Sequence, residues 1–181
     1  MAAPKPNTRH DIIQAALEEF AEAGYDRTTM EAIALRAQVA KGSLYYHFPS
    51  KEALFRALFG ERAERLATLT EEAVARDQWQ GAMRAWSDFF WAEKAFLELF
   101  LSEAWRNRER ERLVQQFLHR IIAPLVPILK TRSDNAELMG YALFGAIAVP
   151  ALHLLKQPEP QRLLLDNLMQ TLTDWISAHM T

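Results

Sequence analysis

The chain has 181 residues, of which 50% are hydrophobic and 24% are charged, and its formal net charge is −2. A chain this apolar can bury a core, which excludes wholesale disorder, and its length suits one compact domain or a small head on a larger body. The absence of cysteine excludes disulfides, thiolate metal sites and cysteine nucleophiles. The overall charge does not point to a polyanionic partner, so a nucleic-acid site would depend on a local arrangement of charge.

The sequence also bears on where the protein acts. The first residues, Met1 to Pro6, are polar and carry no apolar signal segment. We expect no run of about 18 uncharged apolar residues and therefore no membrane-spanning helix. These features predict a cytoplasmic protein with no membrane partner.

The hydrophobic pattern predicts an all-α fold, because apolar residues recur at helical spacing and no alternating strand pattern with hairpin turns is present. Capping residues, glycines and prolines divide the chain into predicted helices over 8–23, 28–37, 41–47, 50–76, 77–91, 94–105, 108–130, 134–156 and 160–179. We expect breaks or bends at Pro124, Pro127 and Pro150. Three short helices followed by six longer ones predict a head over 1–53 and a body over 54–181.

Several of these boundaries depend on single residues. Gly24 suits the position just after the first helix, and Thr28 with Glu31 three residues later predicts a capping box. Further caps are expected at Ser50, at Asp77, and at Asp134 or Asn135.

The stretch from Thr28 to Lys51 reads as a helix, a short turn and a second helix. In the second helix Leu44 and Phe48 are expected to be buried, which leaves a polar and aromatic face outward. A short helix of this kind, with small residues at its start, suits insertion into the major groove of DNA. Gly42 would let the backbone approach DNA closely, while tyrosine hydroxyls, Thr29 and lysine ammonium groups could reach phosphates.

Local charge supports this interpretation. No acid occurs between Glu31 and Glu52, whereas Arg36, Lys41 and Lys51 do occur there, with His47 as a further donor. The alternative is a solvated charged face on an ordinary helical bundle. The helix-turn-helix spacing favours DNA binding.

The segments FAEAGYDRTTMEAIA and VAKGSLYYHFPSKEALF resemble the N-terminal signature of the TetR (tetracycline repressor) family, almost continuously over residues 9–59. The resemblance implies a nine-helix architecture with a helix-turn-helix head on an effector-binding and dimerisation body. It implies a DNA-binding transcriptional regulator and not an enzyme. It also implies the DNA-binding residues Thr29, Lys41, Gly42, Ser43, Tyr45, Tyr46, His47 and Lys51.

Two positions depart from the pattern of that family. Gln38 stands where the turn often has glycine, and a positive φ there would cost about 1 kcal/mol. Ala40 stands where a serine or threonine often caps the second helix, and losing that cap costs about 1 kcal/mol.

The body is rich in large aromatic side chains. For each of them, core packing is the simpler interpretation, but their density among kinked helices, together with the resemblance, implies a hydrophobic pocket for an apolar or aromatic effector. The expected ligand-binding residues are Phe59, Trp86, Phe90, Phe96, Phe100, Trp105, Phe117, Tyr141 and Phe144. The effector's charge stays open. We expect no cofactor. We also expect no metal site, because the five histidines lack helical i, i+3 or i, i+4 pairing.

The resemblance further implies that the last two helices form a four-helix interface in a homodimer; the alternative is burial within one chain. The expected interface residues are Leu138, Ala142, Gly145, Val149, Leu164, Leu168, Leu172 and Trp175. A dimer would place two recognition helices about 34–36 Å apart, the spacing of successive major grooves, so the predicted partner is a palindromic operator in double-stranded DNA.

Three functions can be weighed. The leading hypothesis is a repressor that leaves its operator when a hydrophobic small molecule binds the body. The second is a similar DNA-binding protein without an effector switch, architectural or linked to division, which a body lacking a cavity among Trp86, Phe90, Phe100 and Tyr141 would favour. An enzyme is the third, but the sequence has no nucleophile elbow, phosphate loop or dinucleotide fingerprint.

Overall fold

The computed structural model describes residues 8–104, 106–131, 134–159 and 161–179. Within these ranges every regular element is a helix, which confirms the predicted all-α fold. The helices are α1 (Thr8–Ala23), α2 (Met30–Arg36), α3 (Lys41–His47), α4 (Lys51–Ala92), α5 (Lys94–Glu103), α6 (Arg108–Ile122), α7 (Val126–Leu129), α8 (Ala136–Leu155) and α9 (Arg162–His179). The predicted boundary at residue 77 is confirmed, because α4 is interrupted by non-helical dihedrals at Asp77 and Gln78 although it carries one label. The predicted helix 108–130 is instead divided into α6 and α7.

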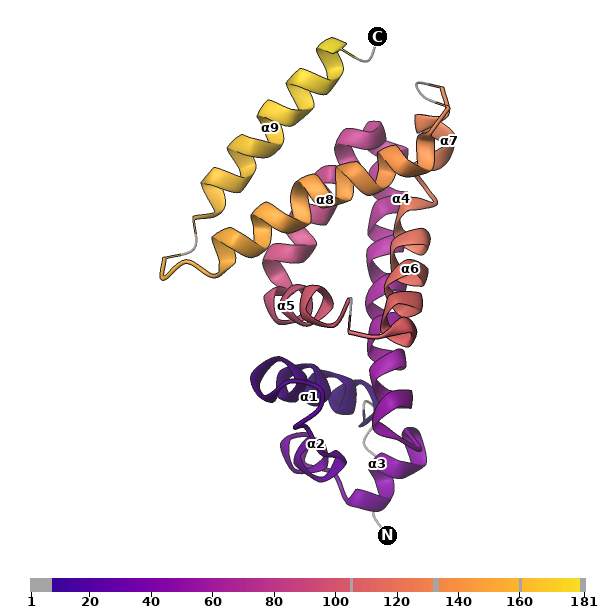
Figure 1. Ribbon diagram of the computed structural model, residues 1–181, viewed down its shortest axis with the longest axis vertical. Coiled ribbons are helices and arrows are strands. Elements are labelled where there is room, and N and C mark those ends of the chain that lie inside the picture. Colours follow the sequence, from indigo (N-terminus) through magenta and orange to yellow (C-terminus); the bar gives the residue numbers. More distant parts are fainter. Residues whose placement is uncertain (1–7, 105, 132–133, 160, 180–181) are drawn as a thin grey trace.

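The long helix α4 connects the two parts of the molecule (Figure 1). Helices α1 to α3 surround its N-terminal end, α5 lies between this head and the upper body, and α6 runs alongside α4. Helix α8 packs across α4, and α9 lies outermost, in contact with both α4 and α8.

One hydrophobic core runs through the head and the body. The ring of Phe55 in α4 lies 5.4 Å from Phe20 of α1 and 4.6 Å from Phe59, which in turn lies 5.3 Å from Phe96 of α5. The boundary expected between residues 53 and 54 stays a prediction, and it falls inside α4.

Local interactions explain most helix ends in the head. Gly24 has φ 80° and its N–H donates to the carbonyl of Phe20, as expected for a glycine after a helix. The predicted capping box at Thr28 is wrong: the side chain of Thr29 caps α2 by accepting from Ala32 N, while buried Thr28 donates to the carbonyls of α1 and its exit. Ser50 accepts from Ala53 N and caps α4 as predicted.

Helix α4 bends where the sequence predicts a new helix. Asp77 and Gln78 have non-helical dihedrals, and Gln78 has φ 50°. The chain then folds back so closely that a Cβ on Gly81 would clash with the carbonyl oxygen of Ala73. A glycine is therefore required just after the bend.

The predictions for prolines and helix caps in the second half of the body agree only in part with the structure. The break between α6 and α7 contains Pro124, as predicted. Pro150 lies inside α8, which continues to Leu155. Asn135 occupies the N-cap position of α8 as predicted, but its side chain makes no capping hydrogen bond.

The expectation that no segment is long and apolar enough to span a membrane is wrong for α8. This helix has 20 residues and a mean hydropathy of 1.8. The sequence estimate overlooked that no charged residue follows Glu137 until Lys156. In the structure α8 packs against α4, α5, α6, α7 and α9, while Leu138 and Val149 on the same helix stay exposed.

Candidate nucleic-acid interface and its junction with the body

The turn between α2 and α3 adopts the strained backbone considered from the sequence. Gln38 has φ 54°, a left-handed conformation that costs a residue with a Cβ about 1 kcal/mol or more. Ala40 is the N-cap of α3 and makes no side-chain capping bond. Both departures are therefore real features of this turn.

Helix α3 has two clearly different faces. Leu44 is 0% exposed and Phe48, just after the helix, is 3% exposed, so both belong to the core. On the opposite side Tyr46 is 85% exposed, and the space around Gly42 is open. Lys41 and Tyr45 are also exposed, and Ser43 and His47 are half-buried. The predicted recognition residues thus share one accessible helix.

The cations of this region are already engaged within the head. The Arg36 guanidinium donates to Glu19 at 2.6 Å, to Glu18 at 3.0 Å and to Glu22 at 2.6 Å, all on α1. The hydrogen bonds that Arg36 donates to these carboxylates raise the pKa of Arg36, and the bond to Glu22 lowers the pKa of Glu22. Arg36 therefore joins α2 to α1.

The two lysines also have partners. Lys41 Nζ lies 2.5 Å from Glu31 Oε1, and this hydrogen bond lowers the pKa of Glu31 and raises that of Lys41. Lys51 Nζ donates to the carbonyls of Tyr25, Asp26 and Thr28 at 2.7, 3.2 and 2.8 Å. These bonds use all three N–H groups of Lys51, so a phosphate contact by this side chain would require one of them to break.

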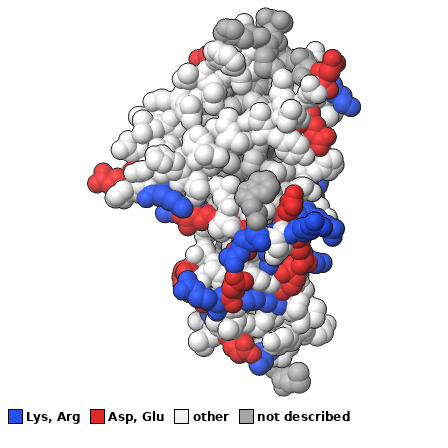
Figure 2. Space-filling view, in the orientation of Figure 1, with Lys and Arg blue, Asp and Glu red and all other residues white. Residues whose placement is uncertain are grey.

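Charged side chains gather at the waist of the molecule rather than at the tip of the head (Figure 2). In this view, blue and red atoms alternate at the level where the head meets α5 and α6, and the upper body is largely uncharged. The waist is therefore the main charged feature of this face.

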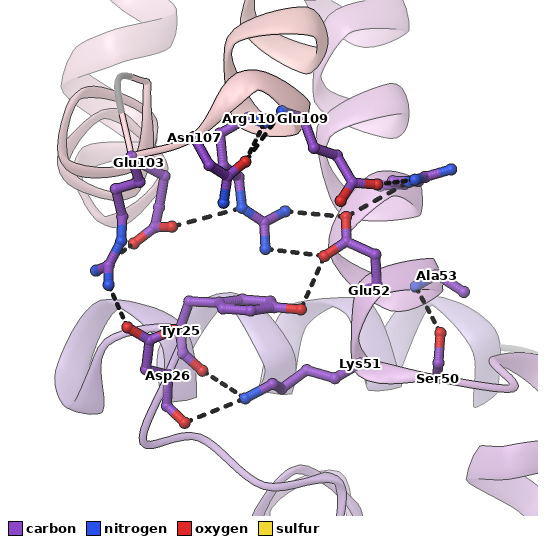
Figure 3. Close-up of polar contacts among 12 residues, drawn as sticks. Tyr25, Asp26, Ser50, Lys51, Glu52, Ala53, Glu103, Asn107, Glu109 and Arg110 are labelled. Atoms are coloured by element: carbon purple, nitrogen blue, oxygen red, sulfur yellow. Dashed lines mark hydrogen bonds and ion pairs between the residues drawn. The ribbon is translucent and has the colours of Figure 1, made fainter.

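A buried ion-pair cluster lies at this waist and joins the head to the body (Figure 3). Arg110 of α6, 5% exposed, donates to both carboxylate oxygens of Glu52 at 3.0 and 2.9 Å, and its Nε lies 3.6 Å from Glu103 of α5. The Tyr25 hydroxyl donates to Glu52 at 2.8 Å. The pKa of Tyr25 is raised, mainly by burial and to a smaller extent by this hydrogen bond. The cluster ties the start of α4 to the exit of α1 and to α5 and α6.

The Arg110 guanidinium also lies over two aromatic rings of the head. Its centre is 4.1 Å from the Tyr25 ring and 3.8 Å from the Phe55 ring. Such cation–π contacts are strongest where water is excluded. The sequence analysis missed this cluster, because its members lie far apart along the chain: Arg110 and Glu52 alone are 58 residues apart.

A second buried arginine joins the same two parts. Arg62 of α4 is 1% exposed and donates to Gln14 of α1 at 3.0 Å and to Glu93 at 3.1 Å. Two buried guanidinium groups therefore hold the head against the body.

The aromatic residues expected to bind a ligand form a packed cluster. Phe59, Trp86, Phe90, Phe96, Phe100, Phe117 and Phe144 are at most 5% exposed. The Phe100 ring lies 4.9 Å from Phe117 and 6.0 Å from Phe144, and the Phe90 ring lies 5.3 Å from Phe144. Tyr141 is half-buried and donates to Glu137 at 3.0 Å. Trp105 lies outside the described residues.

A cavity of about 240 Å³ lies away from this aromatic cluster, between the 79–92 part of α4 and α9. All its lining residues except Met169 have polar or charged side chains, and none of the residues expected to bind a ligand contributes to it. A sequence signal that could have indicated this site is the i, i+3, i+4 spacing of Arg84, Ser87 and Asp88, which places three polar side chains on one face of a helix.

The residues expected at a dimer interface leave an apolar surface on α8 and α9. Leu138, Val149, Leu164 and Trp175 are 67%, 60%, 48% and 60% exposed. Ala142 is exposed, and Gly145, Leu168 and Leu172 are half-buried. Leu163, not among the expected residues, is 70% exposed on the same helix as Leu164.

Known proteins resemble this chain both in the sequence of its head and in its overall fold. Residues 12–58 match the family model described as bacterial regulatory proteins, tetR family. Over 110 residues the chain is 29% identical to the HTH-type transcriptional repressor Rv1474c of Mycobacterium tuberculosis, a match covering 57% of this chain and 59% of that protein. The chain spans between 20% and 59% of the first curated relatives it matches.

Solved structures match nearly the whole chain. GusR of Salmonella enterica is 26% identical with a TM-score of 0.76, covering 98% of this chain and 97% of that one. The transcriptional regulator FadR of Bacillus subtilis, solved in complex with stearoyl-CoA, is 21% identical with a TM-score of 0.78, covering 90% and 96%. The matched relatives are regulators rather than enzymes.

Proposed function

We propose that this chain, whose residues 12–58 match the family model of bacterial regulatory proteins of the tetR family, is a DNA-binding transcriptional regulator that acts as a repressor in the cytoplasm. The observation that carries the proposal is the accessible face of α3, where Tyr46 is 85% exposed and nothing lies near the Cβ position of Gly42. A helix with one face in the core and a bare polar face suits the major groove.

The predicted DNA contacts follow from this placement. Tyr45, Tyr46 and Ser43 offer hydroxyl groups, and Gly42 lets the backbone approach phosphates. Lys41 reaches a phosphate by exchanging its bond to Glu31 for one to DNA. Thr29, His47 and Lys51 complete the predicted set, although Thr29 already caps α2 and Lys51 is bonded to three carbonyls.

We propose that the functional unit is a homodimer formed through α8 and α9. The apolar residues there, Leu138, Val149, Leu164 and Trp175 among them, are roughly half to two thirds exposed in the single chain, and a second copy would cover them. Two α3 helices about 34–36 Å apart would then read a palindromic operator.

The aromatic cluster is the proposed place where an effector acts. Phe59, Phe96, Phe117 and Phe144 come from α4, α5, α6 and α8, so a hydrophobic molecule entering among them spreads these helices. The solved FadR structure with stearoyl-CoA supports an acyl-chain effector as one candidate. Release from DNA needs an effector that prefers the DNA-free state, and a shift from 1:99 to 99:1 takes about 5.5 kcal/mol of preference.

The waist cluster connects this event to the head. Arg110 and Glu103 belong to the helices that an effector would move, and Arg110 holds Glu52 in the first turn of α4. A displacement of α5 and α6 therefore pulls on the N-terminal end of α4, from which α3 is separated by only three residues.

The proposal is tested by selecting binding sites from random double-stranded DNA with the full chain and measuring affinity by fluorescence anisotropy. We expect an enriched inverted repeat. Tyr46→Ala should weaken binding by about tenfold. Tyr46→Phe keeps the ring and removes the hydroxyl group, so it shows which of the two contributes to binding. If no sequence is enriched, or Tyr46→Ala binds as tightly as the parent, the assignment of α3 is refuted.

A second candidate is a DNA-binding protein of the same family without an effector switch. The observation that favours it is the direct ring-to-ring packing among Phe90, Phe100, Phe117 and Phe144. Adding stearoyl-CoA to the protein–DNA complex, with stearate alone and free coenzyme A as controls, distinguishes the two. Release by an acyl compound supports the switch, whereas unchanged affinity with all three supports the second candidate.

A further inference from the structure

The cavity between the 79–92 part of α4 and α9 has a charged rim and a buried floor. Arg84 and Asp88 line it from α4, and Arg162 and Asp166 line it from α9; their side chains are between 42% and 63% exposed. At the floor, Ser87 is 3% exposed and Met169 is 5% exposed. The site therefore combines an accessible mouth with a water-excluded base.

The floor holds a polar atom with an unmet bonding capacity. Within the described part of the chain, Ser87 Oγ is buried and has no hydrogen-bond partner. Buried hydroxyl groups nearly always have a partner, because leaving one unsatisfied is unfavourable. A hydroxyl that is both orphaned and part of a cavity wall indicates a ligand that supplies the missing bond.

The charges on the rim are already balanced by each other. Arg162 pairs with Asp88 and lies 3.6 Å from Asp166, and Arg84 pairs with Asp77. A charged ligand would have to break one of these pairs. A neutral ligand can instead accept from spare guanidinium N–H groups and donate to spare carboxylate lone pairs without breaking any pair.

The remaining features narrow the ligand class. The walls also include the Gln170 amide and the Thr173 hydroxyl, so donors and acceptors surround the space, while Met169 offers one apolar surface. The volume of about 240 Å³ is below that of drug-sized pockets, which start near ~300 Å³. We propose that this cavity binds a small, neutral, polyhydroxylated molecule such as a monosaccharide or cyclic polyol.

This site is separate from the aromatic cluster proposed for the effector. Trp86, next to Ser87, turns its ring toward Phe144 of α8 at 5.7 Å, whereas Arg84, Ser87 and Asp88 face α9. A molecule bound here would join α4 to α9, the helix whose other residues form the exposed apolar surface. The inference concerns binding alone and does not depend on whether the chain binds DNA.

The test uses the full chain without DNA and saturation-transfer NMR, with calorimetry for affinity. The neutral probes are D-glucose, D-glucitol and myo-inositol, and the charged probes on a related skeleton are D-gluconate and D-glucosamine. Saturability is required, because sugars also stabilise proteins non-specifically by exclusion from the surface. We expect at least one neutral probe to bind saturably and to be preferred over both charged ones.

Variants locate the binding. Ser87→Ala and Asp166→Asn should each weaken binding about fivefold or more, because each removes or alters one hydrogen-bonding group. Ser102→Ala, at an exposed position of α5 away from this cavity, is the control and should bind as the parent does. The proposal is overturned if no neutral probe binds, if a charged probe is preferred, or if Ser87→Ala and Asp166→Asn both leave the affinity unchanged.

Discussion

Replacing Arg110 with methionine should lower the free energy of unfolding by about 3 kcal/mol. The guanidinium is 5% exposed and makes a two-bond contact with Glu52 at 3.0 and 2.9 Å. Methionine fills much of the volume but donates nothing, so Glu103, itself 3% exposed, loses a nearby cation and Glu52 loses both bonds. Charge-assisted hydrogen bonds are worth about 1.5–3 kcal/mol each, and the recovered desolvation energy offsets part of this loss.

The measurement is urea unfolding at a fixed protomer concentration, because an oligomer's apparent stability depends on concentration. Glu52→Gln and the double variant complete a mutant cycle, which should give a coupling energy of about 1.5 kcal/mol or more between Arg110 and Glu52. Arg112→Met, exposed on the same helix, is the matched control and should change stability by no more than about 0.5 kcal/mol. A coupling energy below about 0.5 kcal/mol would refute the reasoning, since that is the value of an exposed pair.

Four further outcomes test other features. Glu31→Gln should strengthen DNA binding about twofold or more in anisotropy titrations, because it frees Lys41 from a competing carboxylate; weaker binding would contradict this. Gln38→Gly should stabilise the chain by about 0.5–1 kcal/mol in the same urea assay, since φ 54° suits glycine, and a loss of stability would argue against strain at this turn. Lys51→Ala should lower the unfolding free energy by about 1–2 kcal/mol, and an unchanged stability with a salt slope reduced by about one would instead make it a phosphate contact. Trp175→Asp should convert the dimer to a monomer in size-exclusion chromatography, and an unchanged elution volume would place the interface elsewhere.

Features fixed by local backbone chemistry were predictable from the sequence. The Ser50 cap depends on a few consecutive residues, whereas the left-handed Gln38 and the uncapped Ala40 were considered because both positions depart from the family pattern that the chain resembles. Thr28 and Thr29 show the limit of this approach: both fit a capping pattern, and only the packing of α1 against α2 decides which side chain turns inward.

Contacts between distant helices were not predictable. Arg36 was counted among the cations of the DNA-binding stretch, because no acid occurs between Glu31 and Glu52. In the structure it instead donates to Glu18, Glu19 and Glu22 across the α1–α2 contact. The aromatic spacing correctly placed rings such as Phe100 and Phe117 together. Whether such rings leave a void depends on their rotamers and relative angles, and the helical spacing of residues in the sequence does not determine these.

The unbroken first part of α4 has a mechanical consequence. From Lys51 to Arg76 the helix contains no proline and no non-helical residue, and at 1.5 Å per residue it is about 39 Å long. A rotation of about 5° around its upper end would move its lower end by roughly 3 Å, close to the ~3.4 Å rise of one base pair. In a dimer, opposite movements of two such levers would shift the recognition helices out of register by about two base pairs. Small rearrangements in the body are thereby converted into displacements on the scale at which a DNA sequence is read.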